Sequence, residues 1–460
     1  MAAFEDPKAP PTHRVWVVLL SALVLFYSFS AATRIEISSH QLSRNQRYHS
    51  RLSWGHRAVP GTKLMLHAPG WTLFDQLYLL NGTLYIITDQ PEHLPDTKFI
   101  MSTGLHITNG EENAAALLPT EKELRIITRA EAKSIFGAGA NRIEGVTWLA
   151  NDPDQFLRSH LHFAAELLLG FWRAYAALDP FIPTNGITRL PPPRRLIFPN
   201  FEFPGWRDPG MKNPYVLRSA TTSVLLEYKS DWADRATFAP NVAFMFDRVL
   251  IADRSAAGLG NAFMSNYRTA SSAMDLPGSP FWWKPLRENV VRTSGLDDAA
   301  LKRTSKPVIT YISRQGLRLR SLRREDHEKL VQELNTLGEA QGYEVNVVRS
   351  EDMTPAEEVR LLGRSTVALG VHGPGLVPLI WMGRMPQSTV LEFFYPQGFS
   401  FEYAYTARAL GLSYIGFWEN STFAYPDIPR VAYPPGSHGT GIPIDGALVA
   451  KIIQERLSSQ

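Results

Sequence analysis

Residues 366–376 read TVALGVHGPGL, and this stretch decides how the C-terminal part of the chain folds. Its first residues are small or apolar and predict a buried strand over Thr366–Gly370. The turn His372-Gly373-Pro374-Gly375 follows at once, and the apolar run over Gly375–Met382 predicts a short helix. A buried strand that passes through a tight turn into a helix is the unit from which parallel α/β sheets are built.

The same alternation of strands and helices extends to both sides of this stretch. Apolar, β-branched runs predict further strands over Val308–Ile312, Tyr343–Val348, Thr389–Phe394 and Ser413–Phe417. Periodic patterns between them, one opened by a capping box, predict helices over Glu325–Gly338, Thr354–Leu362 and Ser400–Leu410. This order predicts a Rossmann-like domain whose parallel sheet is covered by helices on both faces.

The middle of the chain mixes short apolar runs with proline-rich breaks, and strands are predicted over Arg195–Phe198 and Val249–Ala252. Asn151-Asp152-Pro153-Asp154 predicts the start of one long helix, with a capping aspartate, proline at the first helical position and an acidic first turn. The helix is expected to run from Phe156 to about Leu178. Along it, Arg158, His162 and Glu166 recur every four residues and therefore share one face.

The N-terminal segment is long and apolar enough to span a membrane. Residues 15–33 carry no charge and are bounded by Arg14 and Arg34. A membrane span needs about 20 apolar residues, whereas the apolar core of a signal peptide has about 7–15. We therefore favour a transmembrane anchor at 15–33, a cytosolic leader at 1–14 and a stem at 34–60. A cleaved signal ending near Ser30-Ala31-Ala32 and a buried soluble helix are the alternatives.

Two triplets match the acceptor pattern for N-glycosylation, Asn81-Gly82-Thr83 and Asn420-Ser421-Thr422. They favour a lumenal location for the residues that follow the anchor. Asn81-Gly82 also lies between two short apolar runs, which is typical of a β-hairpin turn. Both interpretations place Asn81 on the surface.

Composition excludes several classes of protein. The 460 residues include 47 basic and 44 acidic side chains, a balance that does not favour a nucleic-acid-binding protein. Hydrophobic residues make up 44%, enough for a substantial core. Cysteine is absent, so neither disulfides nor thiolate metal sites can form.

Two loops are predicted at the carboxyl ends of parallel strands, where such sheets bind ligands. The loop after Val308–Ile312 and the start of the next helix are rich in arginine: Arg314, Arg318, Arg320, Arg323 and Arg324. Guanidinium groups suit phosphate oxygens, although the cluster alone is also compatible with a solvated basic face. The loop after Thr366–Gly370 contains Gly373 and Gly375, which let a pyrophosphate approach backbone N–H groups; the alternative is an ordinary turn.

The order of these motifs resembles glycosyltransferase family 61. The resemblance covers about residues 150–420 and rests on five motifs: His162-Phe163-Ala164-Ala165-Glu166, Tyr311-Ile312-Ser313-Arg314, Arg320 to Glu325, His372-Gly373-Pro374-Gly375-Leu376, and Leu391-Glu392-Phe393-Phe394. Pro374 and Arg324 stand where the family usually has Ala and Asn.

The resemblance implies a GT-B-like α/β fold, with two Rossmann-like domains facing a cleft. The acceptor-side domain would span residues 61–304 and the nucleotide-sugar-binding domain residues 305–460. It also implies inverting transfer of xylose, N-acetylglucosamine or arabinose from a nucleotide sugar, expected to be a UDP-sugar, to a glycan or glycoprotein. Such enzymes are single-pass type II proteins of the Golgi or endoplasmic reticulum membrane.

Single-displacement transfer needs positive charge for the departing diphosphate and a base for the acceptor hydroxyl. The candidate donor-binding residues are Arg314, Arg320, Arg324, Glu325, His372, Gly373, Gly375 and Glu392. Glu392 is expected either to accept sugar hydroxyls or to be buried in a structural role. His162 or Glu166 is the candidate base, and the alternative for this pair is a solvent-facing stripe or a histidine satisfied by its i+4 carboxylate.

No metal or cofactor is expected. Asp152-Pro153-Asp154 matches the D-x-D pattern of metal-dependent glycosyltransferases, but helix capping explains both aspartates without a metal. A catalytically inactive glycan-binding or scaffold protein with the same fold is the alternative function. An anchored α/β hydrolase is disfavoured, since no G-x-S-x-G nucleophile motif is present.

We predict that the chain translated with microsomes is N-glycosylated and keeps its first 33 residues, because residues 15–33 are long enough to anchor it. Deglycosylation should increase its gel mobility, and the combined substitutions Asn81→Gln and Asn420→Gln should abolish that shift. A product without a mobility change, or one that lacks residues 1–32, would contradict this topology.

Overall fold

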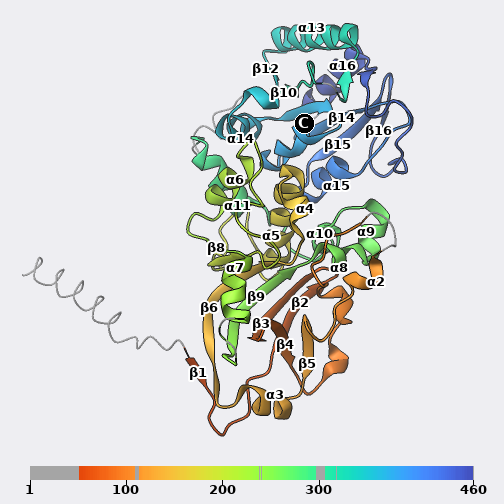
Figure 1. Cartoon of the computed structure of the whole chain (residues 1–460). Helices are drawn as coiled ribbons and strands as arrows, with labels where there is room; N and C mark the ends of the chain where they lie inside the picture. The colour runs from red at the N-terminus through yellow and green to blue at the C-terminus, as the bar shows by residue number, and fades with distance from the viewer. Residues whose placement is uncertain are drawn as a thin grey trace, which may run out of the picture. The chain divides into compact units, whose positions relative to one another are not determined.

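The computed structural model describes residues 51–108, 113–237, 239, 241–296, 306–317 and 319–458. Residues 53–460 form one compact unit, which contains two large β-sheets flanked by helices (Figure 1). The predicted leader and anchor, and all but the end of the stem, lie outside the described residues. Among the helices of the described residues, none is both long and apolar enough to cross a membrane.

The C-terminal sheet has the predicted parallel architecture. Its strands lie in the order β12-β10-β13-β14-β15-β16, and all neighbouring pairs except the last are parallel. The strands are β10 (Val308–Ile312), β12 (Glu344–Val348), β13 (Val367–Val371), β14 (Thr389–Phe394), β15 (Ser413–Trp418) and β16 (Ser421–Phe423). The five strands expected from apolar runs are therefore confirmed, and β16 adds an antiparallel edge.

Helices cover both faces of this sheet, as expected. Ile309, Tyr311 and Leu391 on one face share a core cluster with residues of α13 (Arg324–Gln341) and α16 (Gly446–Ser458). Ala368 and Val390 on the other face belong to the cluster of three further helices: α14 (Pro355–Arg364), η5 (Pro374–Trp381) and α15 (Glu402–Ala409). The helix predicted over Gly375–Met382 is thus a 3₁₀-helix that begins one residue earlier.

The strand order fixes where a ligand can bind. The chain leaves β10 to form β12 on one side and later returns to form β13 on the other. This reversal makes the junction of β10 and β13 a topological switch point, the place where open parallel sheets bind their ligands. The arginine-rich loop after β10 and the glycine-rich loop after β13 lie at this point.

The N-terminal sheet is mixed, in contrast to a purely parallel Rossmann-like sheet. Its strands lie in the order β5-β4-β3-β9-β6-β7-β8, and β2 pairs with β3. They are β2 (Lys63–Ala68), β3 (Trp71–Leu80), β4 (Thr83–Ile87), β5 (Leu124–Ile127), β6 (Gly139–Ala150), β7 (Arg195–Ile197), β8 (Leu225–Glu227) and β9 (Phe244–Ala252). β9, β6, β7 and β8 are parallel to one another.

The predicted hairpin at Asn81-Gly82 is confirmed and makes β3 and β4 antiparallel; β3 is also antiparallel to β2 and to β9. Asn81 and Gly82 adopt φ of 50° and 83°, and they join β3 to β4 with Leu80 opposite Thr83. A two-residue turn can connect only antiparallel strands, so β4 reverses the direction of β3. Asn81 is exposed at the tip, as expected.

The remaining helices connect and cover these strands. They are α2 (Ala114–Leu117), α3 (Arg129–Phe136), α6 (Lys212–Ala220), α7 (Lys229–Ala236), α8 (Arg254–Gly258), α9 (Asn261–Asn266), α10 (Ser271–Met274) and α11 (Lys284–Thr293). A separate pair of short parallel strands, β11 (Ser321–Leu322) and β17 (Thr440–Ile442), follows the arginine-rich loop.

The single helix predicted from Phe156 to Leu178 is wrong in its details. The chain forms α4 (Asp154–Leu157), a π-helix η3 (Leu161–Leu168) and α5 (Leu169–Ala176). Asp152 does not cap α4, which has no side-chain cap. Its carboxylate instead accepts a hydrogen bond from the backbone N–H of Arg254 at 2.8 Å, because that arginine opens α8 beside it.

The helix α5 packs closely on the N-terminal sheet through Trp71. A Cβ atom on Gly170 would overlap the Trp71 ring, which is held by a 3.0 Å hydrogen bond from Nε1 to the carbonyl of Thr269 and by an edge contact with Phe171. Glycine at this position is therefore required by the approach of the indole ring.

We predict that Gly170→Ala lowers the free energy of unfolding. Alanine favours the helical conformation by about 1 kcal/mol, but overpacking in a rigid core opposes folding by about 1–3 kcal/mol. The clash should dominate, so the melting temperature should fall. Gly258→Ala is the matched control, since an added Cβ there meets no atom within 4 Å. Equal melting temperatures for the two variants would show that the Trp71 contact does not constrain the helix.

Candidate functional site

Arg314 and Gly373 lie against each other at the switch point of the C-terminal sheet. Arg314 Nε donates to the carbonyl of Arg320 at 3.0 Å, and this bond directs the guanidinium across the loop after β10. Gly373 has φ of +146°, and a Cβ added to it would lie 3.3 Å from the guanidinium of Arg314. The two loops that the sequence singled out therefore meet at one place.

The charge of Arg314 has no carboxylate partner at ion-pair distance within the described residues. Burial lowers the pKa of Arg314, and the neighbouring Arg320 lowers it further. A cation destabilised by both desolvation and a like charge is stabilised by an anion beside it. The charge and burial of Arg314 therefore suit an anion such as a phosphate group.

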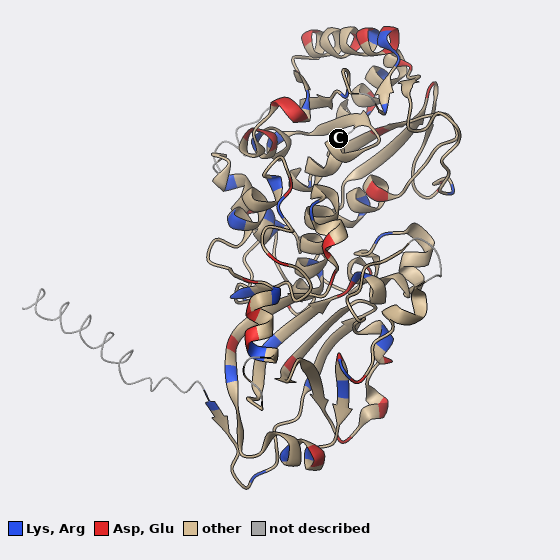
Figure 2. Ribbon diagram, viewed as in Figure 1, with Lys and Arg blue, Asp and Glu red and all other residues tan. Residues whose placement is uncertain are grey.

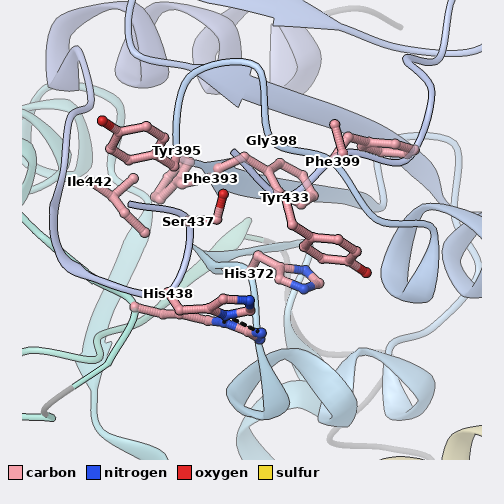
Figure 3. A pocket seen from close by; sticks show the side chains of 12 residues that line it. His372, Phe393, Tyr395, Gly398, Phe399, Tyr433, Ser437, His438 and Ile442 are labelled. Atoms are coloured by element: carbon pink, nitrogen blue, oxygen red, sulfur yellow. Dashed lines mark hydrogen bonds between the residues drawn. The ribbon is translucent and has the colours of Figure 1, made fainter. Parts of the chain in front are cut away.

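Arg320 connects this position to the aromatic rings of His438 and Tyr433. Its Nη2 lies 2.8 Å from Nδ1 of His438, and the ring of Tyr433 stacks on His438 with centroids 5.9 Å apart (Figure 3). His372, Arg320, Tyr433 and His438 all line one pocket, together with Ser437. No sequence pattern pointed to Tyr433, Ser437 or His438, because they lie in an irregular segment about 120 residues beyond Arg314.

His372 forms a buried pair with Glu392. Its Nδ1 lies 2.6 Å from Glu392 Oε1, and the hydroxyl of Tyr414 donates to Glu392 Oε2 at 2.6 Å. Burial raises the pKa of Glu392, while the hydrogen bond from His372 opposes that rise. Because both carboxylate oxygens are occupied, Glu392 orients His372 rather than accepting sugar hydroxyls. The stacked ring of Phe394, 5.0 Å away, fixes the imidazole plane.

His162 forms a second histidine–carboxylate pair, on η3. Its Nδ1 lies 2.7 Å from Glu166 Oε2; the histidine side chain is 31% exposed and the glutamate 4% exposed. An ionised carboxylate only accepts hydrogen bonds, so Nδ1 of the neutral imidazole carries the proton and Nε2 is left as the basic nitrogen. Of the two residues, His162 is the one that an acceptor can reach.

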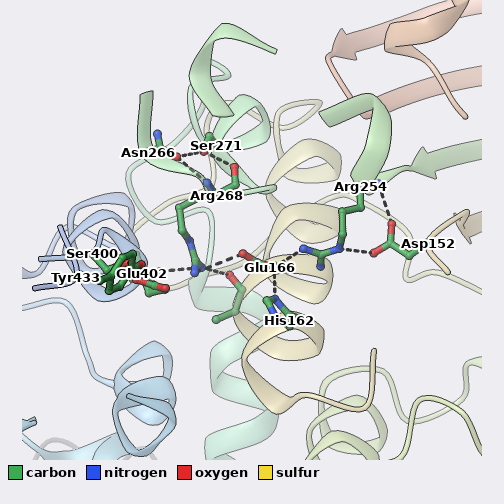
Figure 4. Close-up of polar contacts among 12 residues, drawn as sticks. Asp152, His162, Glu166, Arg254, Asn266, Arg268, Ser271, Ser400, Glu402 and Tyr433 are labelled. Atoms are coloured by element: carbon green, nitrogen blue, oxygen red, sulfur yellow. Dashed lines mark hydrogen bonds and ion pairs between the residues drawn. The ribbon is translucent and has the colours of Figure 1, made fainter. Parts of the chain in front are cut away.

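Glu166 is held between two buried arginines (Figure 4). Arg254 Nη1 donates to Glu166 Oε2 at 2.8 Å, and Arg268 Nη1 lies 3.4 Å from Glu166 Oε1. Burial by itself would raise the pKa of Glu166, but Arg254 and then Arg268 outweigh it and hold the pKa well below the usual 4.5. Glu166 therefore stays ionised and is a poor proton acceptor.

Arg268 connects this pair to the C-terminal sheet. Its Nη2 lies 3.4 Å from the hydroxyl of Thr406 on α15, and Figure 4 shows its guanidinium between Glu166 and Glu402. Burial raises the pKa of Glu402, but His372, Ser400 and Arg268 together bring it below its usual value. Hydrogen bonds and ion pairs therefore connect His162 through Glu166 to Arg268, which reaches α15 at Thr406.

Not every predicted donor residue joins this group. Arg324 opens α13 with its side chain 86% exposed and bonded to Glu328 at 2.9 Å, and Glu325 is also exposed. Figure 2 shows acidic and basic residues interspersed on α13, as on a solvent-facing helix. Gly375 is buried against Ile312 in η5, and Arg318 lies outside the described residues.

The other predicted sites lie at the surface or serve local structure. Asn420 is exposed between β15 and β16. Asp152 Oδ2 lies 3.4 Å from Nε of Arg254, in addition to the bond made by Oδ1, so both of its oxygens face that arginine. Over the described ranges, no three histidine, aspartate or glutamate side chains are grouped so as to hold a metal ion.

Comparison with known proteins identifies the family of the chain. A family model described as Glycosyltransferase 61 matches residues 157–391, just over half of the chain and a span that includes His162, Glu166, Arg314 and His372. A search of curated proteins returned no match. From the extent of the family match, the chain belongs to glycosyltransferase family 61 and is a glycosyltransferase.

Proposed function

We propose that this glycosyltransferase is a membrane-anchored, inverting enzyme of the GT-B type that uses a UDP-sugar in the lumen of the Golgi or endoplasmic reticulum. The observation that carries the proposal is the contact of Arg314 with the Gly373 loop at the switch point of a parallel sheet. Crevices at such points bind nucleotides, and an arginine that lacks a carboxylate partner favours a diphosphate there.

The donor's diphosphate would lie between Arg314 and the backbone at Gly373, with the histidine of the His372–Glu392 pair beside it. As the bond from the anomeric carbon to the diphosphate breaks, the leaving group takes the electron pair and gains negative charge. Groups already fixed around that position stabilise the transition state more than the ground state. Arg320 and the stacked rings of Tyr433 and His438 extend the site.

His162 is proposed as the base. Its Nε2 accepts the proton of the acceptor hydroxyl while the hydroxyl oxygen attacks the anomeric carbon from the face opposite the diphosphate. Glu166 acts as a positioning residue, since it fixes the tautomer and orientation of His162 and stabilises the imidazolium that forms. The transferred sugar is proposed to be xylose, N-acetylglucosamine or arabinose, and the acceptor a glycan or glycoprotein.

We predict that Arg314→Ala lowers turnover by about 10²–10³-fold, as when one fixed donor of a transition-state site is removed. The assay is release of UDP from a panel of UDP-sugars. Arg142→Ala is the matched control, because Arg142 is an exposed arginine paired with Asp247 on the N-terminal sheet. Turnover equal to that of the control, in a variant with a normal melting temperature, would exclude Arg314 from the donor site.

We predict that Gly373→Val weakens UDP binding while the fold is kept. Valine is strained at a φ of +146°, and its Cβ would press on the guanidinium of Arg314. Calorimetric titration with UDP measures the effect. Unchanged UDP affinity in the folded variant would place the diphosphate elsewhere.

We predict that sugar transfer continues in EDTA. Arginines occupy the position where other enzymes use a divalent cation to neutralise diphosphate charge. Activity should be measured in EDTA and after addition of manganese. Complete loss of activity that manganese restores would show that a metal ion is required.

We predict that Glu166→Gln destabilises the protein by about 3 kcal/mol, because two buried arginines lose their counter-charge. The pKa of Glu166 is lower in the folded than in the unfolded chain, so its stabilisation is complete above about pH 4.5 and declines as pH falls toward the folded-state pKa. Unfolding free energies of wild type and variant should therefore converge below pH 4.5. A difference that is independent of pH between 3 and 7 would contradict this.

A further inference from the structure

A cavity of about 650 Å³ opens beside His162 on the side of α8 and α9. We propose that it binds the acceptor as a neutral saccharide, with the ring of Tyr267 as the platform on which one sugar stacks. This inference rests on the proposed function, since it takes His162 as the base that meets the acceptor hydroxyl. The cavity is distinct from the pocket at His372, and the two share no lining residue.

The wall of the cavity is largely apolar and contains aromatic rings. Phe156, Leu259, Phe263 and Tyr267 line it together with His162. Phe156 meets the imidazole of His162 edge-on, with centroids 5.4 Å apart, and its face is covered by Arg254 at 4.5 Å. The apolar surface therefore continues up to the proposed base, where a bound acceptor would present its hydroxyl.

Tyr267 is held in an unusual conformation that exposes its ring. It has φ of 56° and ψ of 33°, a left-handed conformation that is rare for a bulky side chain, and 60% of its surface is exposed. Its N–H donates to the carbonyl of Phe263 at 2.6 Å, and the two rings meet edge-on at 6.0 Å. Strained residues of this kind concentrate at ligand-binding sites.

The turn that presents Tyr267 also places Arg268. Arg268 is buried and contacts Glu166, while Tyr267, one residue earlier, faces the cavity. Asn266 Oδ1 accepts a hydrogen bond from the backbone N–H of Arg268 at 3.0 Å, and this bond fixes the turn that contains Tyr267. The platform and the ion cluster that orients His162 are thus parts of one rigid segment.

The charges of the cavity favour a neutral ligand. Its charged lining residues are Lys98, Arg254, Glu166 and His162, and each already has a partner: Lys98 pairs with Asp96 at 3.1 Å, and the other three pair among themselves. Hydroxyl groups of Thr108, Ser255 and Thr269 supply neutral hydrogen-bonding positions, whereas that of Ser102 already donates to Asp253 at 2.8 Å. Apolar walls with a few neutral polar groups suit a sugar, which has an apolar C–H face and a rim of hydroxyls.

The test uses the full chain saturated with UDP and three probes: methyl β-xyloside, methyl β-galactoside and methyl α-mannoside. Saturation-transfer NMR and titration give the affinity of each, and the peptide acetyl-Gly-Ser-Gly-Thr-Gly-amide is the comparison. Tyr267→Asn removes the ring and keeps the backbone, since asparagine tolerates the left-handed conformation. Tyr267→Phe keeps the ring. Met264→Ala is the matched control, because Met264 is 63% exposed on α9 but does not line the cavity.

At least one glycoside should bind, with saturation transfer to its ring C–H protons. Tyr267→Asn should weaken that binding by about tenfold, whereas Tyr267→Phe and Met264→Ala should change it by less than about twofold. The proposal is overturned if no glycoside binds a protein that binds UDP, if a bound glycoside keeps its affinity in Tyr267→Asn, or if only the peptide binds in a Tyr267-dependent manner. Failure of UDP itself to bind would instead overturn the proposed function.

Discussion

The ion cluster around Glu166 is the interaction on which the candidate site depends. A carboxylate and two guanidinium groups, none more than 9% exposed, share one buried position. Each charge is tolerable there only because the others are present, since burial of an unpaired charge opposes folding strongly. The cluster therefore forces η3, α8 and the turn before α10 to meet.

This constraint reaches both ends of the proposed reaction. Glu166 fixes the imidazole of His162, and Arg268 extends from Glu166 to Thr406 and Glu402 on α15. Glu402 in turn is an electrostatic neighbour of His372. The cluster that orients the residue proposed to meet the acceptor thus also reaches α15, whose Tyr403 lies 5.8 Å from the ring of His372, the residue proposed to meet the donor. Such rigidity is what positioning of two substrates for direct transfer requires.

The π-helix η3 buries most of its residues and still leaves His162 partly exposed. Six of its residues, Phe163 to Leu168, are buried, and yet His162 must remain accessible while Glu166 points into the ion cluster. The wider turns of a π-helix alter the angular spacing of side chains and are frequent at functional sites. The single helix predicted from the sequence assumed that side chains are spaced as in an α-helix along the whole segment.

Most of the C-terminal sheet follows from local sequence patterns. Its central strands β10, β13 and β14 are buried along their whole length, so they appear in the sequence as short apolar runs. Local signals mark where elements begin or reverse: the Thr354–Glu357 capping box does so in this sheet and the Asn81-Gly82 turn in the N-terminal one. It also singled out Arg314, His372, His162 and Glu166, because these residues stand in motifs with fixed spacing.

Which of several similar residues lie together depends on the folded chain and could not be predicted. Arg314 and Arg324 are the same residue type ten positions apart, but one contacts the Gly373 loop and the other faces solvent. Asp152 stands in a sequence pattern typical of a helix cap, but its carboxylate binds the backbone N–H of Arg254, 102 residues later. Local sequence patterns likewise did not predict three further features: the mixed N-terminal sheet, the role of Tyr267 and the stacking of Tyr433 on His438. Local patterns encode burial and turns, whereas strand register and long-range ion pairs depend on contacts between segments that no local pattern specifies.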